Sequence, residues 1–179
     1  NEAIEFLNQN NIKSIIIDHH DINKPFPKSD VIINPKKDNG YKEYDYFCAT
    51  ALSYFFIDIL IKKNRSDFKL NKFLIYVLLA TICDVMPLRK INKIIASNVI
   101  ENYDIKNNVA FKSIFEKLNI KRKLTVDDLG FLIGPIINSG GRLGHSNYGT
   151  DFMTSDNLSI INQRTIDLIK LNDKRKKIE

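Results

Sequence analysis

Two short apolar runs near the start of the chain constrain its fold more than any other feature. Residues 13–17 are Lys-Ser-Ile-Ile-Ile, and Val31-Ile32-Ile33 follows after a proline-containing loop. Short β-branched runs that are apolar on both faces are typical of buried strands in a parallel sheet. Because helical patterns dominate the rest of the sequence, these strands predict an α/β fold. We expect a helix-rich protein with a parallel sheet and flanking helices.

Helical periodicity covers most of the remaining chain. The segment 70–84 is apolar nearly all round, which predicts a buried helix. Thr125 and Asp128 resemble a capping box, with Asp in place of the usual Glu, and predict the start of a helix. The last predicted helix is long and charged. The expected helices are 2–10, 44–63, 70–84, 90–103, 109–118, 125–132 and 157–179.

The composition excludes several classes of protein. A chain of 179 residues with 44% hydrophobic residues can bury the core of about one domain. Its two cysteines, Cys48 and Cys83, lie in apolar stretches and cannot form a disulfide framework. No apolar run reaches the roughly 18 residues that suggest a membrane-spanning helix, and the first residues do not resemble a signal peptide. These features predict a cytoplasmic protein without a membrane partner.

The net charge of +6 has two explanations. Lys and Arg number 27, against 21 Asp and Glu. A basic excess favours a polyanionic partner such as nucleic acid. The alternative is that lysine and asparagine are abundant throughout the chain, in which case the charge does not identify a partner.

The strongest chemical signal is Asp18-His19-His20, directly after the first predicted strand. The chain has three histidines, and two of them stand here beside an acid. Ligands bind at the carboxyl ends of strands in open α/β sheets, and imidazole with carboxylate is metal-ligand chemistry. We favour a metal or catalytic role, and the alternative is a solvated polar turn.

A second signal is Asp84, which closes the predicted buried helix within the sequence Ala-Thr-Ile-Cys-Asp-Val-Met-Pro-Leu at 80–88. The carbonyl end of a helix repels negative charge, so an acid is poorly placed there. A nearby cation would correct this mismatch, and a bound metal ion is one candidate. The alternative is that Asp84 faces solvent where the chain turns at Pro87.

The third signal is the sequence Asn-Ser-Gly-Gly-Arg-Leu-Gly-His at 138–145. Gly134-Pro135 is expected to end or bend the preceding helix, which leaves 138–144 as a glycine-rich loop. Glycines let a backbone approach a phosphate closely, and arginine binds phosphate oxygens in a fork. The hypothesis is a phosphate-binding loop around Arg142, and the alternative is an ordinary flexible loop with one exposed arginine.

Together the three signals resemble a known family. Asp18-His19-His20, then 80–88, then 134–144 occur in the same order as successive motifs of the DHH phosphoesterases. Within that family, the resemblance is to the bacterial exonucleases that degrade single-stranded DNA from the 5′ end. It extends over nearly the whole chain, and three motifs in register make it specific. The fold that it implies is the second half of a DHH domain.

The resemblance implies a two-metal site, with Mn²⁺ or Mg²⁺ as cofactor, that hydrolyses phosphodiester bonds of single-stranded DNA in repair and recombination. Two cations about 3.5–4 Å apart can activate water and stabilise the leaving oxygen together. By this resemblance His19 and Asp84 are metal ligands, and Asp18 ligates a metal or orients the site. Contacts to the substrate or its phosphates are implied for His20, Arg142, Asn138, Gly141 and His145. The expected catalytic residues are Asp18, His19, His20 and Asp84. Other DNA-repair proteins are candidate partners.

The chain departs from the family before Asp18, where earlier acidic motifs are expected. It also lacks the smaller C-terminal domain and the OB-fold of many relatives. We therefore expect a fragment, with 1–155 the C-terminal part of a DHH phosphoesterase domain and 156–179 the start of a long interdomain linker helix. Without the missing carboxylates, this piece alone is expected to be inactive.

Two alternatives stay open. One is another DHH phosphoesterase that acts on short oligonucleotides or cyclic dinucleotides, although the sequences at 84–88 and 141–144 argue against it. The other is a non-catalytic DNA-binding scaffold on the same fold. Retention of the candidate ligands argues against a scaffold; they are Asp18, His19, His20 and Asp84.

Overall fold

The computed structural model describes residues 2–37 and 39–178 and divides into two compact units. The first unit comprises Asn1–Ile95 and the second Ala96–Glu179. Each unit buries apolar side chains of its own. Among the described residues, no helix is both long and apolar enough to cross a lipid bilayer.

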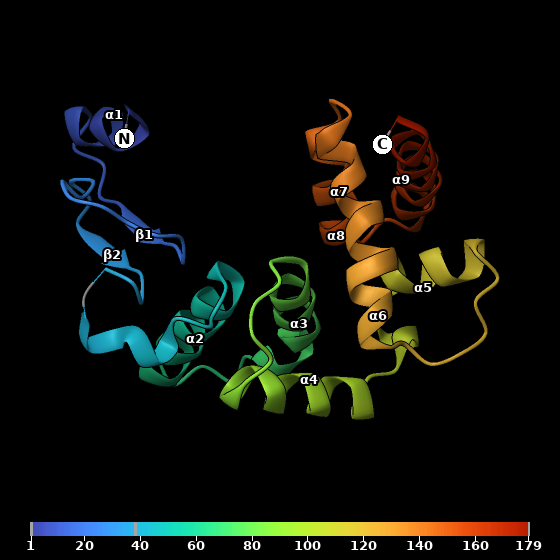
Figure 1. Cartoon of the computed structure of the whole chain (residues 1–179), viewed down its shortest axis with the longest axis horizontal. Helices are drawn as coiled ribbons and strands as arrows, with labels where there is room; N and C mark the ends of the chain where they lie inside the picture. The colour runs from blue at the N-terminus through green and yellow to red at the C-terminus, as the bar shows by residue number, and fades with distance from the viewer. Residues whose placement is uncertain (1, 38, 179) are drawn as a thin grey trace. The chain divides into compact units, whose positions relative to one another are not determined.

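The first unit combines a small parallel sheet with helices. Its strands are β1 (Ile15–Ile17) and β2 (Val31–Ile33), which pair in parallel with Ile15 opposite Val31 (Figure 1). In chain order its helices are α1 (Glu2–Gln9), a 3₁₀ turn (Asn39–Tyr44), α2 (Ala49–Lys63), a second 3₁₀ turn (Leu70–Phe73), α3 (Leu74–Cys83) and the start of α4 (Lys90–Asn102). The predicted helix-rich fold with a parallel sheet is confirmed.

The two strands are less buried than the sequence predicts. Ile15 is 52% exposed and Val31 is 45% exposed, and the other strand residues are half-buried. The described sheet has two strands, and α2 packs against β1. Because a sheet of two strands cannot cover both of its own faces, its apolar side chains stay accessible. The predicted parallel pairing is confirmed, whereas the expected full burial of the strands is wrong.

The core of the first unit forms between α2 and α3. These helices pack against each other, and Ala51 of α2 is fully buried. Cys48, a free thiol at the start of α2, lies with its Sγ 3.6 Å from Thr81 Oγ1 of α3. The predicted buried helix is confirmed, since α3 buries Ile75, Val77, Leu78, Leu79 and Thr81. This packing fixes the C-terminal end of α3, where Asp84 follows.

The second unit is helical in its described residues. After the end of α4 it contains a 3₁₀ turn (Ile105–Asn107), α5 (Val109–Lys117), α6 (Val126–Asp128), a π-helical turn (Leu129–Ile133), α7 (Gly134–Arg142), α8 (Ser146–Thr154) and α9 (Leu158–Ile178). Helices α7, α8 and α9 pack against one another, and α5 packs against α9. Figure 1 shows α6 continuing into α7 as one rod.

The start of α6 is the predicted capping box. The Thr125 hydroxyl accepts the Asp128 backbone N–H at 3.3 Å, while the Asp128 carboxylate accepts the Thr125 backbone N–H at 2.9 Å. Arg122 donates two further hydrogen bonds to this carboxylate, at 2.6 and 2.7 Å. Burial alone would raise the pKa of Asp128, but the hydrogen bonds from Arg122 and Thr125 outweigh it, so the pKa is lowered. The ionised carboxylate therefore stabilises this helix start.

The expected glycine-rich loop at 138–144 is wrong, because most of these residues belong to the end of α7. Gly134-Pro135 does not end a helix, because the chain passes through it from the π-helical turn directly into α7. Tertiary packing overrides the low helix propensity of glycine. A Cβ at Gly140 would lie 2.8 Å from the His145 carbonyl oxygen and 3.1 Å from the Leu168 side chain. Only glycine lets α7 approach α8 and α9 this closely.

A turn at Gly144 separates α7 from α8, a helix that the sequence analysis did not predict. Gly144 has a φ of +84°, in the left-handed region that favours glycine. The predicted final helix is confirmed as α9. Its buried positions recur at helical spacing and include two polar residues; they are Ile161, Thr165, Leu168 and Asn172. The linker role of this helix and the division of the chain at residue 155 remain predictions.

Candidate functional site

The end of β1 positions the Asp18-His19-His20 cluster. The Asp18 backbone N–H donates to the Ile33 carbonyl at 3.0 Å, so the pairing with β2 continues to the first residue of the cluster. Beyond this point His19 and His20 leave the sheet. Asn34, directly after β2, donates a side-chain hydrogen bond to the His20 carbonyl at 2.9 Å. The ends of both strands therefore hold the backbone of the cluster.

Asp18 and His20 form a close pair. His20 Nδ1 lies 2.7 Å from Asp18 Oδ1. Partial burial raises the pKa of Asp18, but hydrogen bonds from the His20 ring and from the backbone of His19 and His20 outweigh it, so the net shift is downward. Asp18 is therefore ionised at neutral pH, and its carboxylate fixes the orientation of the His20 ring.

Asp84 lies at the C-terminal end of α3, as the sequence predicts, and its backbone N–H donates to the Ala80 carbonyl at 2.9 Å. Its Oδ2 lies 3.6 Å from His19 Nε2. The His19 side chain is 12% exposed and the Asp84 side chain 43% exposed. The structure thus brings together an imidazole and a carboxylate that are distant in sequence, at a site that opens to solvent on the Asp84 side.

The turn after Asp84 carries backbone strain. The Val85 N–H donates to the Ile82 carbonyl at 3.1 Å and the Met86 N–H to the Thr81 carbonyl at 2.9 Å, the Schellman pattern that ends many helices. This pattern places Val85 in the left-handed region, with φ +53°, where a β-branched residue is unfavourable. Val85 is also 87% exposed, so packing of its side chain adds little stability to offset the unfavourable backbone conformation. Strain of this kind concentrates at functional sites.

His19 and Asp84 fit one edge of a divalent-metal site. Imidazole nitrogen and carboxylate oxygen are both ligands for ions of the Mn²⁺ type. Two donors that each lie about 2.1 Å from one ion are separated by at most ~4.2 Å, and the 3.6 Å between His19 Nε2 and Asp84 Oδ2 satisfies this limit. Over residues 2–37 and 39–178, no group of three or more His, Cys, Asp or Glu side chains is placed to hold a metal ion. Further ligands are needed to complete such a site.

The site residues predicted in the second unit gather around the end of α7. Asn138, Gly141 and Arg142 are exposed on this helix, and His145 precedes α8. The His145 ring stacks on Tyr148, with ring centroids 4.6 Å apart. Gly140 and Gly141 lie inside α7, so their backbone N–H groups belong to the helical hydrogen-bond pattern. They therefore do not form the expected phosphate cradle. Among the predicted site residues on α7, Arg142 carries the cationic side chain.

Sequence reasoning did not identify Asn34 and Val85 as supports of the site. Asn34 is buried, and its Oδ1 also accepts the Lys36 backbone N–H at 2.8 Å, which fixes the amide that reaches His20. Its only sequence signal is an Asn-Pro pair after an apolar strand, which is typical of a strand end. Val85 lies in the motif at 80–88, but the sequence does not show its left-handed conformation, because that conformation depends on how α3 ends.

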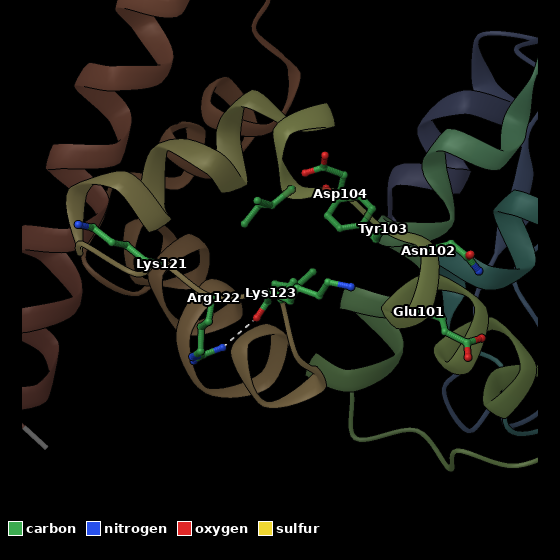
Figure 2. Close-up of a pocket in the computed structure, with 9 residues that line it drawn as sticks. Glu101, Asn102, Tyr103, Asp104, Lys121, Arg122 and Lys123 are labelled. Carbon is green, nitrogen blue, oxygen red and sulfur yellow. Dashed lines mark hydrogen bonds between the residues drawn. The ribbon is translucent and has the colours of Figure 1, made fainter.

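A pocket of about 490 Å³ lies elsewhere in the second unit. Figure 2 shows Lys121, Arg122 and Lys123 across this pocket from Glu101 and Asp104. Side chains of both charge signs line it, and none of the predicted site residues is among them.

Comparison with known proteins supports the resemblance. No family model matches the chain. It is 27% identical to the single-stranded-DNA-specific exonuclease RecJ of Haemophilus influenzae over 188 aligned residues, and 29% identical to RecJ of Escherichia coli over 189. Each alignment covers 99% of this chain. In sequence, the chain is similar to RecJ. It spans about a third of the length of these RecJ proteins, 33% in each case.

Solved structures of RecJ share the fold of this chain. A crystal structure of exonuclease RecJ bound to manganese matches with a TM-score of 0.84 at 20% identity, covering 98% of this chain and 44% of that one. RecJ of Thermus thermophilus in complex with Mn²⁺ matches with a TM-score of 0.83, also at 20% identity, covering 97% of this chain and 26% of that one. The RecJ fold therefore extends along nearly all of this chain.

Proposed function

We propose that this chain contributes part of the active site of a metal-dependent, single-stranded-DNA-specific 5′→3′ exonuclease that acts in DNA repair and recombination. The observation that supports this most is the 3.6 Å approach of His19 Nε2 to Asp84 Oδ2, directly after a parallel strand. The RecJ proteins that the chain resembles are named single-stranded-DNA-specific exonucleases, and RecJ has been solved with Mn²⁺ and with Mg²⁺.

His19 and Asp84 would hold a divalent cation, Mn²⁺ or Mg²⁺, together with ligands from outside the described residues. When bound, a divalent cation of this kind would supply a nucleophilic water at neutral pH and stabilise charge on the reacting phosphate. The near-burial of the His19 ring lowers the local dielectric constant, which strengthens the attraction between the ligands and a cation.

Asp18 would orient His20 toward the substrate. Because Nδ1 of His20 faces the Asp18 carboxylate at 2.7 Å, Nε2 is the ring nitrogen left for a ligand. His20 is exposed, so a DNA phosphate can reach it. A ring held in one orientation meets the scissile phosphate without first losing rotational freedom.

Arg142 would bind a phosphate of the DNA strand. It is exposed at the C-terminal end of α7, where a cation is electrostatically favourable and a guanidinium can form a fork of two hydrogen bonds. Asn138 and His145 remain proposed substrate contacts. The net charge of +6 is consistent with a nucleic-acid partner. A cytoplasmic location and other DNA-repair proteins as partners belong to the same proposal.

The test compares substrates with the whole protein in the presence of Mn²⁺ or Mg²⁺. A long single-stranded oligonucleotide is labelled at either end and compared with its duplex, a dinucleotide and a cyclic dinucleotide. We expect release of nucleotides from the 5′ end of the single strand, little attack on the duplex, and no reaction after chelation. Preferential cleavage of the dinucleotides would favour another DHH phosphoesterase, and DNA binding without cleavage would favour a scaffold. Either result would overturn the proposal.

A further inference from the structure

Two neighbouring glycines in α7 differ in their surroundings. A Cβ at Gly140 would meet the His145 carbonyl oxygen at 2.8 Å, so helix packing requires a glycine there. A Cβ at Gly141 would have no heavy atom within 4 Å, and Gly141 does not have a positive φ. Glycine is less favourable than alanine inside a helix. Neither packing nor backbone conformation explains Gly141, which leaves the close approach of a ligand as a structural reason.

Gly141 lines a groove of about 430 Å³ between α7 and α8. This volume lies within the roughly 300–1,000 Å³ that is usual for small-ligand sites. No lining residue is charged. The polar lining residues are Asn138, Ser146, Thr150 and Thr154, and the larger apolar ones are Ile137 and Met153.

The polar groups of the groove are available to a ligand. Within the described parts of the chain, the side chains of Asn138, Ser146 and Thr150 form no hydrogen bond to protein atoms. The Thr154 hydroxyl donates to the Thr150 carbonyl at 2.9 Å and can still accept a hydrogen bond. The groove therefore offers donors and acceptors without a formal charge, which suits a neutral ligand that has hydrogen-bonding edges.

We propose that this groove binds a nucleobase of single-stranded DNA, with Gly141 providing the space for its approach. The inference rests on the proposed exonuclease function, and it assigns Gly141 to the base instead of the phosphate expected from the sequence. A phosphate would find no cation among the lining residues, whereas a base can hydrogen-bond to amide and hydroxyl groups. Met153 and Ile137 offer apolar surface to the ring. Arg142, the next residue on α7, keeps the phosphate contact.

The test measures DNA binding by the whole protein without divalent metal, so that no strand is cleaved. Gly141→Ala adds one methyl group to the groove, and because it meets no protein atom within 4 Å, the melting temperature should stay the same or rise. Thr150→Val is a second variant that removes a hydroxyl and keeps the side-chain shape. Asn147→Ala, on α8 but outside the groove lining, is the control. Each variant is titrated with a single-stranded oligonucleotide and with an abasic strand of the same length.

We expect Gly141→Ala to weaken binding of the base-containing strand about tenfold, the effect of losing roughly one hydrogen-bonded contact. Thr150→Val should cause a smaller loss, and neither variant should weaken binding of the abasic strand. Equal losses on both strands, or no loss on either, would overturn the nucleobase assignment. If Gly141→Ala lowers the melting temperature, its binding loss could come from altered folding. In that case the binding of Thr150→Val to the two strands decides whether the groove binds a base. Failure of the exonuclease proposal would differ, because the wild-type protein would then bind neither strand or cleave no single-stranded DNA.

Discussion

The candidate sites of the two units differ in charge and in how they are assembled. In the first unit, two carboxylates and an imidazole converge from separate elements, with Asp18 and His19 after β1 and Asp84 after α3. In the second unit, the predicted residues share α7 and the turn after it, and the groove beside them is uncharged. Convergent charge suits metal and phosphate chemistry, whereas neutral hydrogen-bonding groups suit the binding of bases. On the proposed function, the first unit contributes metal ligands for hydrolysis and the second unit binds the strand.

Removing a ligand from the first unit should have the largest effect. In the whole protein, His19→Ala or Asp84→Ala should lower Mn²⁺-dependent hydrolysis by more than the roughly 100-fold cost of losing a residue that only supports a metal ligand. Binding of single-stranded DNA, measured by fluorescence anisotropy, should largely persist. If either variant kept wild-type kinetics, the assignment of hydrolysis to the first unit would fail.

Adding a methyl group at Gly140, which is tightly packed in the second unit, should have the next largest effect, a loss of unfolding free energy. Gly140→Ala places a Cβ 2.8 Å from the His145 carbonyl oxygen, and a backbone atom cannot easily move away. Overpacking of this kind costs about 1–3 kcal/mol of unfolding free energy. Gly141→Ala is the matched control and should be neutral or stabilising by up to about 1 kcal/mol. Chemical denaturation of both variants checks this, and equal destabilisation would contradict the distinction between the two glycines.

A buried charge in the second unit should contribute to stability and not to chemistry. Asp128→Ala removes the capping box and should cost about 1–2 kcal/mol of unfolding free energy while leaving hydrolysis unchanged. Because folding lowers the pKa of Asp128, its contribution is complete above the unfolded pKa of about 3.9. It is lost as the pH falls through the lower folded pKa. Denaturation curves of wild type and Asp128→Asn should therefore converge below about pH 4, and a constant difference would count against this role.

Exchanging residues between two helix ends should have the smallest effect. Val85 after α3 and Asn119 after α5 occupy the same left-handed position, with φ +53° and +54°. Asparagine tolerates this conformation, whereas valine does not. Val85→Asn should raise the unfolding free energy by about 1 kcal/mol, and Asn119→Val should lower it by about the same amount. The melting temperature should therefore rise for Val85→Asn and fall for Asn119→Val. If both melting temperatures shifted in the same direction, Val85 would not be strained.

Much of the fold was predictable because it depends on neighbours in sequence. The parallel strand pair, the buried helix α3 and the capping box at Thr125 each follow from a local pattern of apolar or capping residues. The end of α7 was not predictable in this way. The low helix propensity of glycine is measured in isolated helices. Gly140 is helical in this protein because α7 packs closely against α8 and α9 at that position.

The candidate site was predictable in its residue types and less so in its geometry. The resemblance implied that His19 and Asp84 act together, but their 3.6 Å separation depends on how the end of α3 meets the end of β1. The hydrogen bond from Asn34 to His20 depends on pairing between the strands. The groove beside Gly141 exists only because two helices pack, and neither helix contains a motif that specifies it.

Mn²⁺ binding to the whole protein tests most directly whether His19 and Asp84 share one ion. Calorimetric titration of wild type, His19→Ala, Asp84→Ala and the double variant gives the affinity of each. If the two residues hold the same ion, each single variant should weaken Mn²⁺ binding by at least about tenfold, and the double variant should lose little more. Losses that simply add, or Mn²⁺ binding that none of the variants changes, would contradict a shared metal site.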